Sequence, residues 1–85
     1  MEIIILDGSR MTARAQSYEY LRNTFRFPEY FGNNLDALND CLGELGNNVI
    51  IIMVNSQAMK DNLGKYGEKM LKVFHEAENC TFIEK

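Results

Sequence analysis

Two carboxylates four residues apart, Asp36 and Asp40, are the residues in this sequence whose type and spacing could do chemistry. Side chains at this spacing lie on one face of an α-helix, so the two acids are expected to project side by side. No Lys or Arg occurs between Arg26 and Lys60 to pair with them. The pair could therefore serve hydrolysis, a metal ion or a basic partner.

Hydrolysis and metal binding both fit this arrangement poorly. The paired carboxylates of glycosidases face each other across a substrate at roughly 5–9.5 Å, whereas these two are expected on one exposed helix. A calcium loop needs the EF-hand spacing, which is absent, and a transition metal needs His or Cys ligands nearby. The lone His75 is expected to be a solvated surface residue. We therefore expect no cofactor, no metal and no small-molecule substrate.

The helix that must carry the two acids can be placed from its cap and its apolar stripe. Asn34 is a strong N-cap residue, so the helix is expected to open at Leu35. Asp36 then lies in the first turn, where the helix dipole favours a negative charge, but Asp40 lies beyond it. The predicted buried face consists of Leu35, Leu38, Leu42 and Leu45. The predicted exposed face consists of Asp36, Asn39, Asp40 and Gly43.

The rest of the chain predicts a small α/β fold. Residues 3–6 and 49–54 are continuous β-branched runs, typical of parallel strands covered on at least one face, and residues 80–84 suit an edge strand. The long helical stretches between these runs indicate crossover connections rather than hairpins. We expect a single domain spanning residues 1–85.

Capping residues set the expected bounds of the other helices. Thr12 is expected to cap a helix with Tyr18, Leu21 and Phe25 on its apolar stripe, ended before Pro28. A second helix is expected to start with Ser56 as its cap and to stop at Gly64. A third is expected from about Glu68 to Glu78, burying Met70, Phe74 and Ala77, with Asn79 as its stop.

Charge and composition narrow the classes of partner. A formal net charge of −3 argues against a nucleic-acid surface, because such surfaces need clustered Lys and Arg. The apolar run at residues 3–6 is shorter than the roughly 7–15 residues of a signal peptide, and no stretch approaches the ~20 residues of a membrane span. Cys41 and Cys80 match no redox or zinc motif. A cytoplasmic protein with reduced thiols is expected.

A basic protein partner is the hypothesis that accounts for two exposed acids that the neighbouring sequence does not neutralise. Such a negative patch steers a cationic partner and discourages acidic ones. The flanking aromatic residues Tyr30 and Phe31 could add contact area, although Phe31 is expected in the core.

The stretch PEYFGNNLDALNDCL, residues 28–42, closely resembles the signature of the barstar family of barnase inhibitors. The resemblance resumes at EKMLKVFHEAENC, residues 68–80, and elsewhere is compatible but generic. It implies a barstar-like fold, with a three-stranded parallel sheet packed by about four helices. It also implies an intracellular inhibitor of a basic ribonuclease, monomeric when free, and not an enzyme.

The resemblance further implies roles for single residues. The position matching Asp40 plugs the nuclease active site, and the one matching Asp36 pairs with an arginine, so both acids would mimic RNA phosphates. Tyr30, Asn34 and Glu76 match further contact positions. Two positions on the binding face depart from a well-known member, since Asn39 replaces a tryptophan and Gly43 replaces a hydroxyl residue. These departures keep open an alternative, a barstar-like regulatory or assembly module that binds a basic protein other than a nuclease.

Overall fold

The structure is a computed structural model that describes residues 1–29, 31–46 and 48–85. Three parallel strands form one sheet in the order β1-β2-β3. The strands are β1 (Glu2–Asp7), β2 (Val49–Val54) and β3 (Thr81–Glu84). The described helices are η1 (Gly8–Arg10, 3-10), α1 (Arg14–Phe25), α2 (Leu35–Gly43), α3 (Ser56–Leu63) and α4 (Lys65–Glu76). The expected α/β fold, with a three-stranded parallel sheet and four α-helices, is confirmed.

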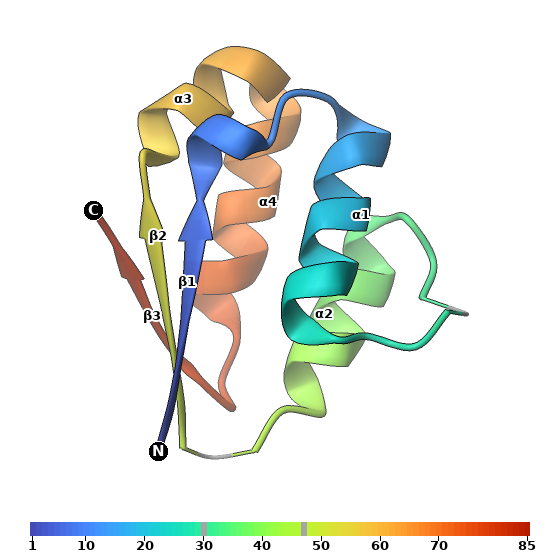
Figure 1. The fold of residues 1–85 in the computed structure, drawn as a ribbon, viewed down its shortest axis with the longest axis vertical. Coiled ribbons are helices and arrows are strands. Elements are labelled where there is room, and N and C mark those ends of the chain that lie inside the picture. Colours follow the sequence, from blue (N-terminus) through green and yellow to red (C-terminus); the bar gives the residue numbers. More distant parts are fainter. Residues whose placement is uncertain (30, 47) are drawn as a thin grey trace.

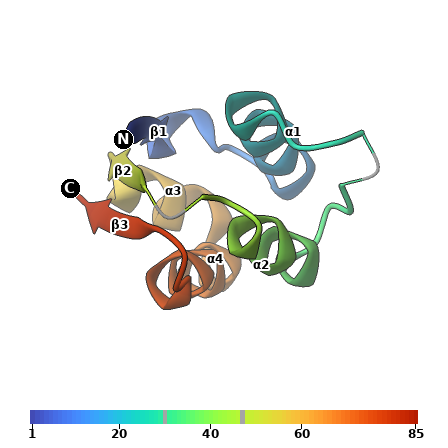
Figure 2. The ribbon, with the colours of Figure 1, turned by 90° about the horizontal axis from the view of Figure 1, so that it is seen from below.

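The α-helices lie on one side of the sheet, as the two views in Figures 1 and 2 show. The reason is the strand order, which follows the chain order, so both crossovers proceed across the sheet in the same direction. Crossovers between parallel strands are almost always right-handed, and two successive crossovers of one hand place their helices on the same face. The opposite face of the sheet is therefore covered by no helix of the described residues.

Burial alternates along the strands because only one face of the sheet is covered. In β2, Val49, Ile51 and Met53 are buried, whereas the residues between them are half-buried. On β1, Ile3 is 53% exposed and Ile5 is 61% exposed. Apolar residues thus occupy the solvent-facing positions of β1 and β2 as well as the covered ones.

The core lies between the covered face of the sheet and the helices. Tyr18 and Leu21 of α1, Leu38 of α2, and Met70 and Phe74 of α4 are buried in it. Burying a side chain of this size contributes roughly 1.5–3 kcal/mol relative to leaving it exposed. These five predicted apolar positions are confirmed as core residues, whereas Phe25 and Ala77, predicted on the same stripes, are only partly buried against the core.

Helix α1 does not begin as predicted. Its N-cap is Ala13, which makes no side-chain capping hydrogen bond, so the prediction that Thr12 caps the helix is wrong. Thr12 lies one residue earlier, and its backbone N–H donates to the side-chain oxygen of Gln16 at 2.8 Å. The Thr12 hydroxyl also donates to this Gln16 oxygen, at 3.3 Å, instead of accepting an N–H of the first turn as a cap would. The helix ends at Phe25, before Pro28, as expected.

Helix α3 also starts differently from the prediction. Its N-cap is Asn55, with φ of 56°, and Ser56 is the first helical residue rather than the cap. Gly64 ends the helix with φ of 62°, a conformation that glycine adopts at little cost, and this expectation is confirmed. Helix α4 begins immediately afterwards at Lys65 and ends at Glu76, so its predicted range of Glu68–Glu78 was placed too late in the chain.

One cluster fixes the C-terminal strand to the helices. Glu84 of β3 is bonded through Oε1 to His75 Nε2 at 2.8 Å, and its Oε2 accepts from Ser56 Oγ at 2.8 Å. Lys60 Nζ lies 3.9 Å from the same carboxylate. The prediction for His75 is therefore incomplete, because its ring, though partly exposed, has a carboxylate partner. These hydrogen bonds, first that of His75 and then that of Ser56, lower the pKa of Glu84 below its ordinary value.

Candidate protein-binding site

The start of α2 is fixed by its cap. Asn34 has an extended backbone with φ of −150°, and its side-chain oxygen accepts the backbone N–H of Ala37 at 2.7 Å. This hydrogen bond satisfies one of the free donors at the helix start. The predicted cap and the predicted first residue, Leu35, are both confirmed. Asp36 consequently lies in the first turn of the helix.

The two faces of α2 are divided as predicted. Leu38 and Leu42 are fully buried, while Leu35 and Leu45 are partly buried against the same core. The four residues predicted on the other face are all exposed; they are Asp36, Asn39, Asp40 and Gly43. Because two leucines anchor the helix, its exposed side chains project from a fixed backbone. We call these four residues the acidic face.

The acids of this face have no partner within the described part of the chain. Across residues 1–29, 31–46 and 48–85, neither Asp36 nor Asp40 takes part in a side-chain hydrogen bond or an ion pair. Other carboxylates are engaged, since Asp7 accepts from Asn55 at 3.0 Å and Asp61 accepts from Gln57 at 3.0 Å. The charge of the acidic face is thus left available for an external group.

Glu76 joins the acidic face through the tertiary structure. It lines a surface hollow of about 440 Å³ between α2 and the end of α4, together with Asn39, Gly43 and Glu78. A donor on the Asn79 side chain binds the Gly43 carbonyl oxygen and ties the two segments together. The structure therefore brings a third acid of the predicted site, after Asp36 and Asp40, beside α2. Glu78, an acid in the same hollow, was not predicted, and only its charge marked it in the sequence.

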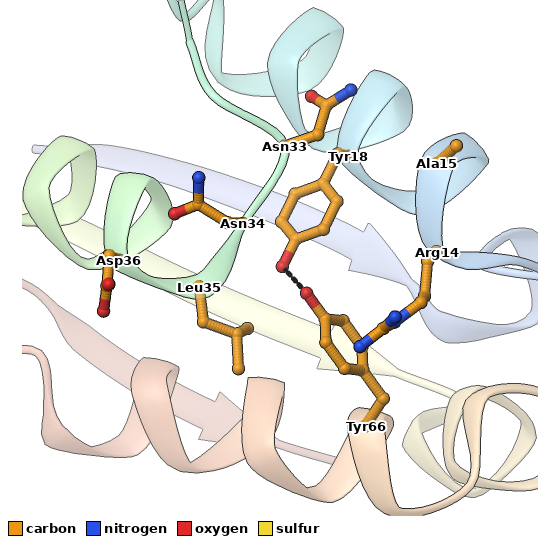
Figure 3. A pocket seen from close by; sticks show the side chains of 8 residues that line it. All are labelled: Arg14, Ala15, Tyr18, Asn33, Asn34, Leu35, Asp36 and Tyr66. Carbon is orange, nitrogen blue, oxygen red and sulfur yellow. Dashed lines mark hydrogen bonds between the residues drawn. The ribbon is translucent and has the colours of Figure 1, made fainter.

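A second groove lies between α1, α2 and α4, as Figure 3 shows. It measures about 500 Å³, and its lining includes Arg14, Tyr18, Asn34, Asp36 and Tyr66. The hydroxyl groups of Tyr18 and Tyr66 are hydrogen-bonded to each other at its centre. Burial, followed by that hydrogen bond, raises the pKa of Tyr18, so this phenol stays neutral at physiological pH. Sequence reasoning missed Arg14 and Tyr66 because they come from elements far from α2.

Of the predictions for the two aromatic residues before α2, the structure tests only the one for Phe31. Phe31 is 8% exposed and packs against Phe27 with ring centroids 5.0 Å apart, so its expected place in the core is confirmed. Tyr30, a predicted contact residue, lies outside the described residues.

The thiols show no sign of activation. Cys41 and Cys80 are free and partly buried. Burial raises the pKa of both, and the neighbouring charges of Glu44 and Asp40 raise that of Cys41 further. The thiolate form, which is the reactive one, is therefore disfavoured.

Within residues 1–29, 31–46 and 48–85, no group of three or more His, Cys, Asp or Glu residues lies close enough together to hold a metal ion. No helix among these residues has both the length and the apolar character needed to cross a membrane.

These features together define a small α/β domain with a charged helix face exposed to solvent. Comparison with known proteins gives the family. The family model described as "Barstar (barnase inhibitor)" matches residues 1–82. The "Putative ribonuclease inhibitor YrdF" of Bacillus subtilis (strain 168) is 34% identical over 79 residues, which cover 92% of this chain and 87% of that protein. The chain belongs to the barstar family, as the resemblance of its motifs indicated, and proteins of this family are inhibitors rather than enzymes.

Proposed function

We propose that this protein inhibits a basic ribonuclease by placing the acidic face in the active site of the enzyme. Family membership supports a ribonuclease as the partner. The observation that carries the mechanism is that Asp36 and Asp40 are exposed on one helix face and have no partner in the described chain. A chain selected for stability alone would not place like charges four residues apart, because such pairs weaken a helix slightly.

The chemistry of the proposed contact is that of phosphate recognition. A nuclease pocket presents Arg and Lys donors arranged for the oxygens of a phosphodiester, and a carboxylate offers two oxygens to the same donors. Asp40 takes the central position and Asp36 pairs with a neighbouring basic residue. The inhibitor has no phosphodiester at this point, so the enzyme cannot cleave what it binds.

The rigidity of α2 favours this role. The Asn34 cap fixes the start of the helix, and Leu38 and Leu42 anchor it in the core. Because the carboxylates are held by an ordered backbone, little backbone entropy is lost when the complex forms.

Neighbouring residues extend the proposed surface. Glu76 and Glu78 add negative charge beside α2, while Asn39 and Gly43 leave a hollow that can receive a projecting side chain of the enzyme. Tyr30 and Asn34 are proposed as further contacts at the start of α2. The inhibitor is proposed to be a cytoplasmic monomer that protects cellular RNA until the ribonuclease is secreted.

The test is capture followed by an activity assay. Immobilised wild-type protein and the double variant Asp36→Ala, Asp40→Ala are exposed to lysate and culture fluid of the source organism. Retained proteins are assayed for ribonuclease activity, and both proteins are also tested as inhibitors of purified barnase. A control double variant, Glu19→Ala with Asp61→Ala, removes the same charge from exposed positions of α1 and α3.

We expect wild type and the control to retain a small basic ribonuclease and to block its activity, and the Asp36→Ala, Asp40→Ala variant to do neither. Equal retention by all three proteins would refute the proposed site. Retention of a basic protein without nuclease activity would instead support the regulatory or assembly module that Asn39 and Gly43 keep open.

A further inference from the structure

We infer that the groove beside Asp36 receives an acidic side chain of the ribonuclease, and that this acid pairs with Arg14. The basic residue of the enzyme that pairs with Asp36 lies next to that acid. This inference rests on the proposed function and names a specificity contact within it. The groove thus recognises a pair of opposite charges on the partner rather than positive charge alone.

The two charges lie at opposite sides of the groove. Arg14 is the first residue of α1, and Asp36 is in the first turn of α2. In Figure 3 the Leu35 side chain and the hydrogen-bonded Tyr18 and Tyr66 lie between them. Both residues line the groove, and no ion pair joins Arg14 to Asp36, so the two charges do not neutralise each other by direct contact.

The guanidinium of Arg14 is held in place before any partner arrives. It lies over the Tyr66 ring at 3.8 Å from the ring centroid, in a cation–π arrangement. The Tyr66 hydroxyl is in turn bonded to that of Tyr18, whose side chain is only 1% exposed. A stacked guanidinium keeps its N–H donors in the plane parallel to the ring, where they can reach an acceptor. A positioned arginine loses less side-chain freedom on binding than a mobile one.

An acid is the group that these donors fit. Arg14 makes no side-chain hydrogen bond or ion pair with any other residue that the structure describes. A carboxylate matches the fork of guanidinium donors in a bidentate manner. Burying Arg14 against a uniformly basic enzyme surface would instead be repulsive, and like-charge contacts are a common way of rejecting wrong partners. The groove, at about 500 Å³, has room for a carboxylate side chain.

Removing Arg14 separates this contact from simple charge attraction. The Arg14→Ala variant makes the net charge more negative by one unit from −3. If attraction of the whole molecule were all that mattered, the variant would associate faster and bind at least as tightly. If Arg14 pairs with an acid, the variant loses a contact that forms only in the complex, and dissociation becomes faster.

Arg10 supplies a matched control. It also lies over a tyrosine, with its guanidinium 5.5 Å from the Tyr20 ring centroid, but it does not line the groove. The experiment measures association and dissociation rates of wild type, Arg14→Ala, Arg14→Glu, Arg10→Ala and Asp40→Ala. The probe is the ribonuclease that immobilised wild-type protein retains, purified to homogeneity. Chemical unfolding of each variant verifies that the inhibitor is folded.

We expect Arg14→Ala to dissociate about tenfold faster, Arg14→Glu faster still, and Arg10→Ala at the wild-type rate within about twofold. Unchanged or slower dissociation of Arg14→Ala, with Asp40→Ala strongly weakened, would overturn the inference and leave the proposed function standing. Wild-type binding by Asp40→Ala would overturn the proposed function, and the inference with it. Should Arg14→Ala fail to fold, Arg14→Gln, which keeps the length of the side chain without its charge, decides by the same criterion.

Discussion

The carboxylates of the acidic face and the carboxylate of Glu84 have opposite surroundings. Asp36 and Asp40 on α2 are exposed and have no partner in the described chain, whereas Glu84 on β3 is bonded to His75 and Ser56 and lies near Lys60. The chemical group is the same, but Asp36 and Asp40 are free to interact with a partner protein, whereas the interactions of Glu84 already stabilise the fold. The comparison predicts that mutations on α2 weaken binding and mutations at Glu84 weaken folding.

The largest expected effect is that of Asp40→Ala on binding. Truncation leaves the basic groups of the ribonuclease buried without a partner, and such losses cost about 3–5 kcal/mol. Titration calorimetry or inhibition assays should show this loss, while the free energy of unfolding stays within about 0.5 kcal/mol of wild type. An unfolding energy that falls together with the affinity would show that Asp40 supports the fold, and the contrast with Glu84 would disappear.

Salt should weaken the contribution of the acidic face to association. The association rate constant with the ribonuclease should fall roughly tenfold from low to high salt concentration, because dissolved ions screen the long-range attraction between exposed charges. Stopped-flow measurements across a salt series check this, and the Asp36→Asn, Asp40→Asn variant should show a shallower slope. An association rate that does not respond to salt would contradict steering by the acidic face.

The Glu84→Gln variant tests the folding side of the comparison. We expect a loss of about 1 kcal/mol in the free energy of unfolding at pH 7, a modest value because solvent screens this partly exposed cluster. Denaturant unfolding measures it, and ribonuclease binding by the folded variant should be unchanged. Weakened binding at full stability would mean that Glu84 belongs to the interface.

The same variant predicts a dependence on pH. The pKa of Glu84 is lowered from its ordinary value of 4.5 in the folded protein, so the unfolded chain takes up a proton first as the pH falls. The contribution of Glu84 to stability is therefore complete above about pH 4.5 and is lost as the pH drops through the lower folded value. Unfolding measured from pH 6 to pH 2 should show Glu84→Gln converging on wild type at the acid end. A constant difference between the two proteins would contradict the cluster.

The smallest expected effect is that of Gly43→Ala. A Cβ added at Gly43 meets no atom within 4 Å, and alanine favours helix over glycine, so stability should rise by about 0.5 kcal/mol. Thermal unfolding measures this.

Gly43→Leu then tests the hollow beside Glu76, since filling it should weaken ribonuclease binding while leaving the fold intact. Unchanged binding by that variant would show that no side chain of the enzyme enters the hollow.

Most of the fold could be predicted because it depends on local patterns. The β-branched runs indicated β1 and β2, the run at residues 80–84 indicated β3, and the leucine spacing with the Asn34 cap indicated α2 and its two faces. The starts of α1 and α3 were mispredicted because several polar residues compete at each of them. At α1 the Thr12 hydroxyl donates to Gln16 instead of accepting a helix N–H, and at α3 the Ser56 hydroxyl donates to Glu84 instead of capping the helix. Such choices depend on which partner lies within reach in the folded chain.

The sequence by itself determined the strands, the acidic face and its lack of positive neighbours along the chain, because periodicity and capping act over a few residues. The tertiary structure alone decided what lies beside that face. It brought Glu76 and Glu78 to one side of α2 and Arg14, stacked on Tyr66, to the groove at Asp36. It also gave Glu84 the partners that Asp36 and Asp40 lack. Packing of distant elements creates these neighbours, and a local pattern carries no information about which distant side chain will arrive.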